Sequence, residues 1–298
     1  MEAGELLKKV RKIEIKTRGL SDQIFSGEYH TAFKGKGMTF SEVREYQFGD
    51  DIRAIDWNVT ARFNAPFIKV FEEERELTVM LLIDVSASKE FGTISQFKQD
   101  LVTELSAVLA FSAIQNNDKI GVIFFSNIIE KFIPPKKGKS HILRIIRELL
   151  TFEPINKGTD ISEALRYFTN AIKKRSIAFV ISDFMDINFN EKGEIGEEAL
   201  KIANKKHDIV AIRVYDQREQ EIPSIGLVKL RDAETGKFRW IDTSSKQLRE
   251  HFQHYNENRA EILKKLFARC GVDATSIRTD EPYVKPLMGL FKKRESRR

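Results

Sequence analysis

Cysteine is almost absent from this chain of 298 residues, and Cys270 is the only one. A disulfide needs two thiols, so no internal disulfide can form, and a reducing compartment is the natural setting. Long hydrophobic runs are absent as well, because no stretch reaches the about 18 apolar residues of a membrane-spanning helix. Residues 1–20 carry charges throughout and lack the apolar core of a secretory signal. These absences predict a cytoplasmic protein without a membrane span.

Several catalytic motifs are also lacking. The chain has neither a G-x-S-x-G nucleophile turn nor an HExxH zinc motif, so we expect His251 and His254 to be surface or half-buried residues. Residues 138–140, Gly-Lys-Ser, match only the end of a phosphate-binding loop, because Ile133 occupies the position of its first glycine. We expect a surface loop there, followed by a helix at 141–151, and no bound nucleotide.

The positive charge of the chain is concentrated at its C-terminus. The formal net charge is +6, and residues 283–298 hold six basic residues and one acidic residue. The bases are Lys285, Lys292, Lys293, Arg294, Arg297 and Arg298, and the acid is Glu295. A basic tail could bind nucleic acid or anionic lipid. A solvated, frayed terminus is the simpler interpretation of so short a segment, and we favour it.

Four near-continuous apolar runs indicate buried strands, at residues 77–83, 120–125, 177–181 and 209–214. Such runs are typical of parallel strands that are covered on both faces. Apolar residues recur at helical spacing between and after these runs. The expected helices begin near residue 94, cover 141–151, begin at 161 and cover 248–270. This alternation predicts an α/β fold, a doubly wound, mostly parallel sheet with helices on both faces.

Three other segments have weaker patterns. Residues 4–18 are typical of a basic amphipathic helix, and residues 228–243 of a hairpin with its turn near residues 234–236. Residues 24–76 indicate short strands and turns without a strong helix. We therefore expect a small N-terminal helix and a β-rich segment ahead of the main sheet.

Short oxygen-bearing side chains lie where ligands bind in such a fold, at the carboxyl ends of the strands. Asp84, Ser86 and Ser88 follow the first apolar run, Thr159 precedes the helix at 161, and Asp183 follows the third run. Hydroxyl and carboxylate oxygens are the ligands of a hard cation such as Mg²⁺. We predict that these five residues hold Mg²⁺, with Mn²⁺ or Ca²⁺ as alternatives, and leave one coordination position for a carboxylate of another protein. The prediction requires Ser86, Thr159 and Asp183 to lie together and open to solvent.

Each of these residues also has a plainer interpretation. Ser88 and Thr159 could cap helices, and Asp183 could be a turn residue. The metal interpretation is favoured because all of them converge on one edge of the expected sheet. Asp160 is expected to be a helix cap and not a ligand.

The spacing of these residues resembles a known metal site. D-x-S-x-S at 84–88, Gly158-Thr159 and Asp183 resemble the metal-ion-dependent adhesion site, or MIDAS, of von Willebrand factor A domains. The resemblance covers residues 77–280 and implies a sheet of the von Willebrand factor A type. It also implies protein binding through the metal ion in place of catalysis.

A second resemblance covers residues 37–76. Its core, Arg44-Glu45-Tyr46, Gly49-Asp50-Asp51 and Asp56-Trp57, resembles the hallmark segment of the family known as domain of unknown function 58. The resemblance implies a layout of 1–76 for the N-terminal helix and hallmark segment, 77–282 for the von Willebrand factor A-like domain and 283–298 for the basic tail. It also implies that a MoxR-type AAA+ ATPase is the partner, in protein maturation or stress tolerance.

The hallmark segment contains a cluster of opposite charges, Asp50, Asp51, Asp56, Arg44, Arg53 and Arg62. The cluster could serve catalysis or hold a second metal ion. Equal numbers of acids and bases favour a buried salt-bridge network that fastens the segment to the sheet. Trp57 is expected to be packed.

Three functions remain open from the residues alone. The first is a non-catalytic protein-binding module that depends on a metal ion. The second is a metal-dependent hydrolase or phosphotransferase with Asp84 as nucleophile, although such enzymes need a second acid where Ser86 stands. The third is nucleic-acid binding through the basic tail. We rank them in this order.

Overall fold

The computed structural model describes residues 11, 13, 39–63, 65–72, 77–86, 98–156, 158–186, 189, 194–231 and 238–296. The chain separates into two compact units, a small one at Phe33–Leu77 and a large one made of Met1–Ala32 and Thr78–Arg298. Ser88 lies outside the described residues, as does all but two residues of the helix predicted at 4–18.

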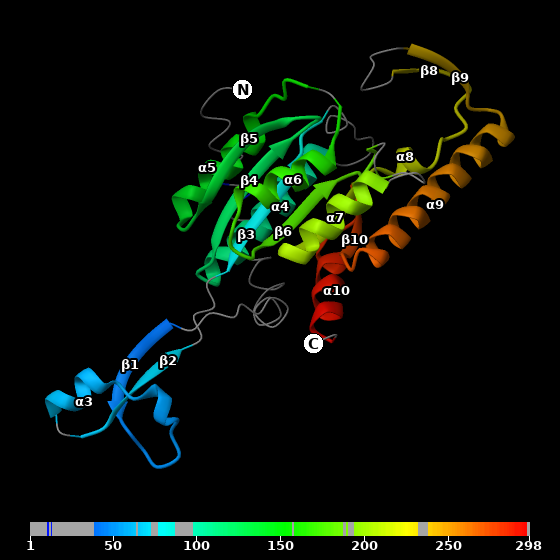
Figure 1. Cartoon of the computed structure of the whole chain (residues 1–298). Coiled ribbons are helices and arrows are strands. Elements are labelled where there is room, and N and C mark those ends of the chain that lie inside the picture. The colour runs from blue at the N-terminus through cyan, green and yellow to red at the C-terminus, as the bar shows by residue number, and fades with distance from the viewer. Residues whose placement is uncertain are drawn as a thin grey trace. The chain divides into compact units, whose positions relative to one another are not determined.

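The small unit is built on an antiparallel pair of strands, β1 (Thr39–Glu45) and β2 (Phe67–Glu72). A 3-10 turn, η1 (Ile52–Ala54), and a short helix, α3 (Trp57–Phe63), connect them (Figure 1). The segment was expected to lack a strong helix, and the helix it contains has only seven residues.

Capping side chains stabilise the start of both η1 and α3. The Asp51 carboxylate caps η1 by accepting from the Arg53 amide at 2.9 Å. At the start of α3, the Asp56 carboxylate accepts from the Asn58 amide at 3.0 Å and from the Val59 amide at 3.3 Å. Elements as short as η1 and α3 show no apolar periodicity, so the sequence pattern did not reveal them.

The large unit contains a six-stranded sheet in the order β10-β7-β6-β3-β4-β5. Every neighbouring pair is parallel except β4 and β5, which are antiparallel at the edge. The strands are β3 (Thr78–Asp84), β4 (Lys119–Phe125), β5 (Ile129–Lys136), β6 (Ile177–Ser182), β7 (Asp208–Tyr215) and β10 (Asp273–Arg278). This order confirms the predicted α/β class, a doubly wound, mostly parallel sheet.

Helices cover both faces of this sheet (Figure 1). The helices of the large unit are α4 (Lys98–Gln115), α5 (Lys139–Thr151), α6 (Ile161–Ala171), α7 (Glu194–Lys206), α8 (Gln217–Gln220), α9 (Lys246–Arg269) and α10 (Val284–Glu295). Met80 and Leu82 of β3 share one core cluster with α6, α7 and the end of α9. The alternate residue Leu81 is also fully buried and belongs to the other face, where α4 packs on β3 and β4 beside α5. Burial on both faces explains why these strands read as unbroken apolar runs.

The predicted hairpin is present as an antiparallel pair, β8 (Leu227–Arg231) and β9 (Phe238–Asp242). The Lys229 ammonium lies over the Phe238 ring, 4.5 Å from its centroid. The turn expected near residues 234–236 lies outside the described residues. The hairpin precedes α9 and lies near the N-terminal end of that helix (Figure 1).

Most of the C-terminal segment is helical, so the expectation of a frayed terminus is wrong for residues 284–295. Leu287, Leu290 and Phe291 of α10 are buried, at the i, i+3 and i+4 spacing of a helix face. Arg294 is 6% exposed and pairs with Asp208 at 2.5 Å. Among the described residues, no helix combines the length and apolar character needed to cross a membrane.

The close approach of β5 to β4 generates the first prediction. A Cβ atom at Gly121 would lie 2.7 Å from Met80 Sδ, 2.8 Å from the Pro135 nitrogen and 2.9 Å from the Ile133 oxygen. Two of these atoms are backbone and cannot move aside. We expect Gly121→Ala to lower the free energy of unfolding by about 1–3 kcal/mol, as measured by urea denaturation.

Gly289→Ala is the matched control for this change. No heavy atom lies within 4 Å of a Cβ at Gly289, which sits inside α10. Alanine is favoured over glycine within a helix by roughly 1 kcal/mol, so this variant should be as stable as the wild type or more stable. Equal stability of Gly121→Ala and the wild type would contradict the packing argument.

Candidate metal centre

Asp84 is the last residue of β3, a central strand of the sheet, and hydrogen bonds fix both of its oxygens. The Ser182 hydroxyl, at the end of the neighbouring strand β6, donates to Asp84 Oδ2 at 2.6 Å. The Ser86 amide donates to Asp84 Oδ1 at 3.0 Å. Ser182 was not among the predicted residues, although its place directly before Asp183 at a strand end was a usable signal. The two strands that flank the candidate centre are therefore joined through this carboxylate.

The loop that carries Thr159 lies against the end of β4. The Asp160 amide donates to the Ser126 carbonyl at 2.9 Å, one residue beyond β4. Next to it, the Val85 amide donates to the Phe125 carbonyl at 2.9 Å, so the chain after Asp84 follows the same edge. The structure thus brings the segments of Asp84 and Thr159 to one edge of the sheet, as expected.

The third segment reaches the same edge through Asp186. Its carboxylate is 2% exposed and accepts from the Ile161 amide, at the start of α6, at 2.8 Å. Asp160 accepts from the Glu163 amide at 3.0 Å and is the N-cap of that helix, which confirms its predicted role. The loop after β6 is therefore hydrogen-bonded to the start of α6, and the loops after β3 and before α6 are each hydrogen-bonded to the end of β4.

The two carboxylates of the candidate centre repel each other. Burial and the negative charge of Asp183 raise the pKa of Asp84 to about 6, although hydrogen bonds from Ser182 and Ser86 act in the opposite direction. A nearby like charge raises the pKa of a carboxylic acid because it disfavours the ionised form. The two groups together therefore favour a cation nearby.

Lys98 already supplies one such cation. It is the first residue of α4, is 3% exposed, and places its ammonium 3.1 Å from Asp183 Oδ2. The same ammonium pairs with Glu219 of α8. Burial lowers the pKa of Lys98, but the charges of Asp183 and Glu219 outweigh this effect and the pKa is raised overall. Lys98 is therefore held in the charged form.

Lys98 was missed because nothing near it in the sequence points to Asp183. The two residues are separated by 85 positions, and only the fold brings them together. One signal was available, since Lys98 precedes Leu101 and Leu105 at the i, i+3 and i+7 positions of the buried face of α4. A lysine on such a face needs an acidic partner.

Two arginines add to the positive charge. Arg213 of β7 is 7% exposed, and its pKa is lowered overall, because burial outweighs the charges of Tyr215, Asp183 and Glu219, which act in the opposite direction. Arg259 of α9 donates to the Phe184 carbonyl, directly after Asp183, at 2.8 Å. The carboxylates at this edge are thus largely compensated by side chains of the chain itself.

The predicted openness of the centre is contradicted at two of its residues. Ser86 is 2% exposed and Asp183 is 7% exposed, whereas Asp84 and Thr159 are half-buried. The burial has a local cause, because Asp183 is paired with Lys98 and accepts from the Met185 amide at 3.0 Å. A metal ion could reach the full ligand set only if the side chains around it moved.

The donor set still has the chemistry of a hard-cation site. Among the described residues, no group of three or more His, Cys, Asp or Glu is arranged to hold a metal ion. The candidate centre differs from such groups, because it offers two carboxylates, of Asp84 and Asp183, together with the hydroxyls of Ser86 and Thr159. Oxygen ligands of this kind suit Mg²⁺, which retains several of its waters.

The charge cluster predicted in the small unit is smaller and more exposed than expected. Arg44 pairs with Asp50 at 2.8 Å, and their side chains are 37% and 19% exposed. Asp56 pairs with Lys69 at 3.4 Å, in place of an arginine. Trp57 is 68% exposed, which contradicts the expectation of a packed ring. These pairs brace the strands and turns of the unit itself.

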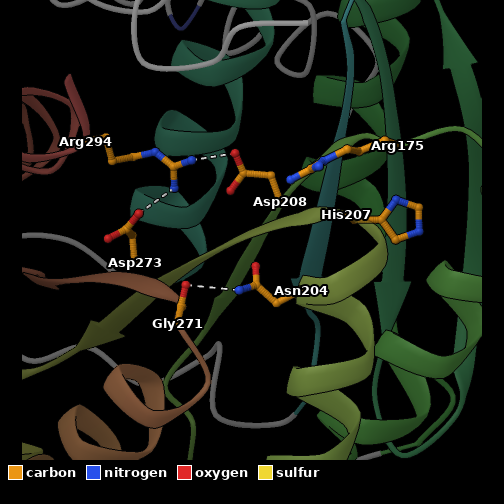
Figure 2. A pocket seen from close by; sticks show the side chains of 7 residues that line it. All are labelled: Arg175, Asn204, His207, Asp208, Gly271, Asp273 and Arg294. Atoms are coloured by element: carbon orange, nitrogen blue, oxygen red, sulfur yellow. Dashed lines mark hydrogen bonds and ion pairs between the residues drawn. The ribbon is translucent and has the colours of Figure 1, made fainter. Parts of the chain in front are cut away.

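A cavity of about 240 Å³ lies at the opposite ends of the strands (Figure 2). Its walls are Arg175, Asn204, His207, Asp208, Gly271, Asp273 and Arg294. Asp208 and Asp273 begin β7 and β10, and Arg294 bridges them, at 2.5 and 2.9 Å (Figure 2). Ligands of parallel α/β sheets bind at the other edge. The ion pairs of Arg294 with Asp208 and Asp273 hold α10 on the sheet, whereas neither ring nitrogen of the buried His207 has a hydrogen-bond partner among the described residues.

One family matches most of the chain. It is described as "Protein of unknown function DUF58", and the match covers residues 42–261. An uncharacterized protein of Mycobacterium tuberculosis is 28% identical over 282 residues, which are 94% of this chain and 86% of the relative. An uncharacterized protein of Mycobacterium bovis is similar to the same extent.

Solved structures with a similar fold share little sequence with the chain. A conserved hypothetical protein, BatB, from Bacteroides thetaiotaomicron has a TM-score of 0.49 and 20% identity, and the match covers 74% of this chain and 99% of that one. An aerotolerance-related membrane protein from Bacteroides fragilis has a TM-score of 0.48 and 19% identity, with coverage of 74% and 100%. At such identities a likeness concerns the fold alone.

His207, in the wall of the cavity, generates a prediction about pH. It is fully buried, its ring centroid lies 4.3 Å from that of Phe168, and burial lowers its pKa to about 4. In the unfolded chain the His207 side chain takes up a proton near pH 6.5, whereas in the folded chain this side chain stays neutral down to about pH 4. The free energy of unfolding should therefore fall by about 2–3 kcal/mol between pH 7 and pH 4 because of this residue.

Urea denaturation at several pH values tests this effect. His207→Leu should reduce the fall in stability towards acid pH. His254→Leu is the control and should show the fall of the wild type, because the side chain of His254 is 75% exposed. The same pH dependence in His207→Leu and the wild type would rule out the assignment.

Proposed function

The chain belongs to the DUF58 family, and from this premise we propose that it is a non-catalytic protein-interaction protein that binds its partner through a divalent metal ion. The ion would be Mg²⁺, with Mn²⁺ or Ca²⁺ as alternatives. One observation supports the proposal most directly. Asp84, at the end of β3, and Asp183, directly after the neighbouring strand β6, lie close enough that the charge of Asp183 raises the pKa of Asp84. The Ser86 amide and the loop of Thr159 lie at the same edge.

The ligands would be Asp84, Ser86, Ser88, Thr159 and Asp183. Because hydroxyls outnumber carboxylates in this set, little negative charge would contact the ion directly. When bound, the ion supplies an electrophilic coordination position that a carboxylate of a partner protein can fill. The chain itself positions the ligands, since Ser182 and the Ser86 amide hold the Asp84 carboxylate at the end of β3.

The hydrolase or phosphotransferase with Asp84 as nucleophile is less well supported. Such enzymes need a second acid two residues after the nucleophile, and this chain has Ser86 there. Nucleic-acid binding by the tail also loses support, because Arg294 is buried in ion pairs with Asp208 and Asp273. Protein binding through a metal ion is therefore the better-supported function.

The proposed partner is a MoxR-type AAA+ ATPase or a client protein with an accessible carboxylate. The ATPase is suggested by the resemblance of residues 37–76 to the family hallmark segment. The small unit adds an independent reason to expect protein binding, because it exposes Phe48 fully and Ile52, Trp57 and Phe63 by about two thirds each. Exposed apolar side chains that gather on one small unit are typical of protein-binding surfaces.

Metal binding tests the ligand assignment. Titration calorimetry with Mg²⁺ or Mn²⁺ should detect weak binding by the wild type, and Asp84→Ala should abolish it without unfolding the chain. Asp160→Ala is the matched control at the same edge, because Asp160 is a helix cap. It should lose roughly 1 kcal/mol of stability and keep its metal affinity. Unchanged metal binding in Asp84→Ala would remove the assignment.

Partner binding tests the function itself. A pull-down with the MoxR-type ATPase should recover the complex in the presence of Mg²⁺ and lose it when a chelator is added. Asp84→Ala should behave like the chelated wild type, and Asp160→Ala like the untreated one. A complex that forms equally well with and without chelator would take the metal ion out of the mechanism.

A further inference from the structure

Lys98 is a buried cation at the candidate metal centre that the metal hypothesis alone does not explain. Its side chain is 4% exposed and lies between the carboxylates of Asp183 and Glu219. A charge removed from water so completely must be paired, because an unpaired buried ion is very costly. The two carboxylates fully account for the position of the ammonium.

The ammonium and a divalent ion would compete for the same charge. Asp183 is one of the proposed metal ligands, and Lys98 contacts its Oδ2 at 3.1 Å. A metal ion held by Asp84 and Asp183 would share the Asp183 carboxylate with the ammonium. Two cations on one carboxylate repel strongly where little water screens them. The ammonium and the metal ion therefore cannot both interact strongly with the Asp183 carboxylate at the same time.

Glu219 offers Lys98 a second place to remain paired. Its side chain is 22% exposed and is fixed from the other side, because its Oε2 accepts from the Asp216 amide at 3.0 Å in the capping box of α8. If the ammonium left Asp183, it could stay paired with Glu219 without being released into an uncompensated buried position.

We propose that Lys98 is a built-in counter-ion of Asp183 that a divalent metal ion displaces on binding, and that Glu219 retains the displaced ammonium. This inference rests on the proposed function. It accounts for the burial of Asp183, and it makes the metal affinity of the centre depend on two residues that are not metal ligands. Lys98 lowers the metal affinity because it competes for Asp183. Glu219 permits the displacement because it keeps the ammonium paired.

The two residues should affect metal binding in opposite directions. Lys98→Met removes the competing charge, so the full chain should bind Mg²⁺ in calorimetry, and Mn²⁺ in electron paramagnetic resonance, about tenfold more tightly than the wild type. Lys131→Met is the matched control. Lys131 lies on the edge strand β5 and pairs with Glu148 at 2.6 Å, and its loss should leave the metal affinity unchanged.

Glu219→Gln should change the metal affinity in the opposite direction. It tests the displacement of Lys98 even if Lys98→Met does not fold. The displaced ammonium would then have no second carboxylate, so metal affinity should fall severalfold below that of the wild type. A purely structural role for Lys98 predicts no gain in affinity in Lys98→Met. Unchanged or weaker binding in Lys98→Met, or unchanged or tighter binding in Glu219→Gln, overturns the inference.

The same experiments distinguish a failure of this inference from a failure of the proposed function. Binding by the wild type that is lost in Asp84→Ala, without a gain in Lys98→Met, overturns the inference alone. If neither the wild type nor Lys98→Met binds either ion, the proposed function and the inference fall together. Binding by Lys98→Met alone, and its loss in the double variant with Asp84→Ala, supports the displacement of Lys98.

Discussion

The central strand β3 ends in a carboxylate that cannot be left without partners. β3 lies between β4 and β6 and is covered on both faces, so Asp84 emerges from the most deeply buried part of the sheet. A buried carboxylate must be hydrogen-bonded and charge-compensated, or it takes up a proton. The arrangement of the carboxyl edge follows from this constraint. Two hydrogen bonds, from the Ser182 hydroxyl and the Ser86 amide, stabilise the Asp84 carboxylate. The Lys98 ammonium compensates the charge of Asp183.

The same constraint gives the edge its chemical character. Two carboxylates beside several hydroxyls form a place where a hard cation is favoured, whereas Lys98 and Arg213 supply positive charge from within the chain. Under the proposed function, Asp183 would be shared between the internal Lys98 ammonium and an external metal ion. Such sharing would suit reversible metal binding, because neither cation would be held by the full charge of the acids.

The main errors of the sequence interpretation concern short or terminal segments. The apolar runs of β3, β4, β6 and β7 were recognised because strands buried on both faces carry an unbroken pattern. The helix α3 was missed, since a few residues fixed by the Asp56 cap show no periodicity. The charges of the C-terminal segment concealed the apolar face of α10, where Leu287 and Phe291 are buried. A high density of charge does not by itself indicate a solvated terminus.

The sequence by itself determined the fold class, the places of β3, β4, β6 and β7 and of α4, α5, α6 and α9, and the sheet edge towards which Asp84 and Asp183 are directed, but it did not predict β5, α7 or β10. These features follow from local periodicity and from the rule that parallel strands direct their carboxyl ends to one edge. Only the tertiary structure decided what surrounds those ligands. Lys98 lies 85 positions from Asp183 and 121 from Glu219, so their pairing depends on how α4 and α8 pack around the sheet. Burial and charge compensation are properties of the packed molecule, because each depends on neighbours that are distant in sequence.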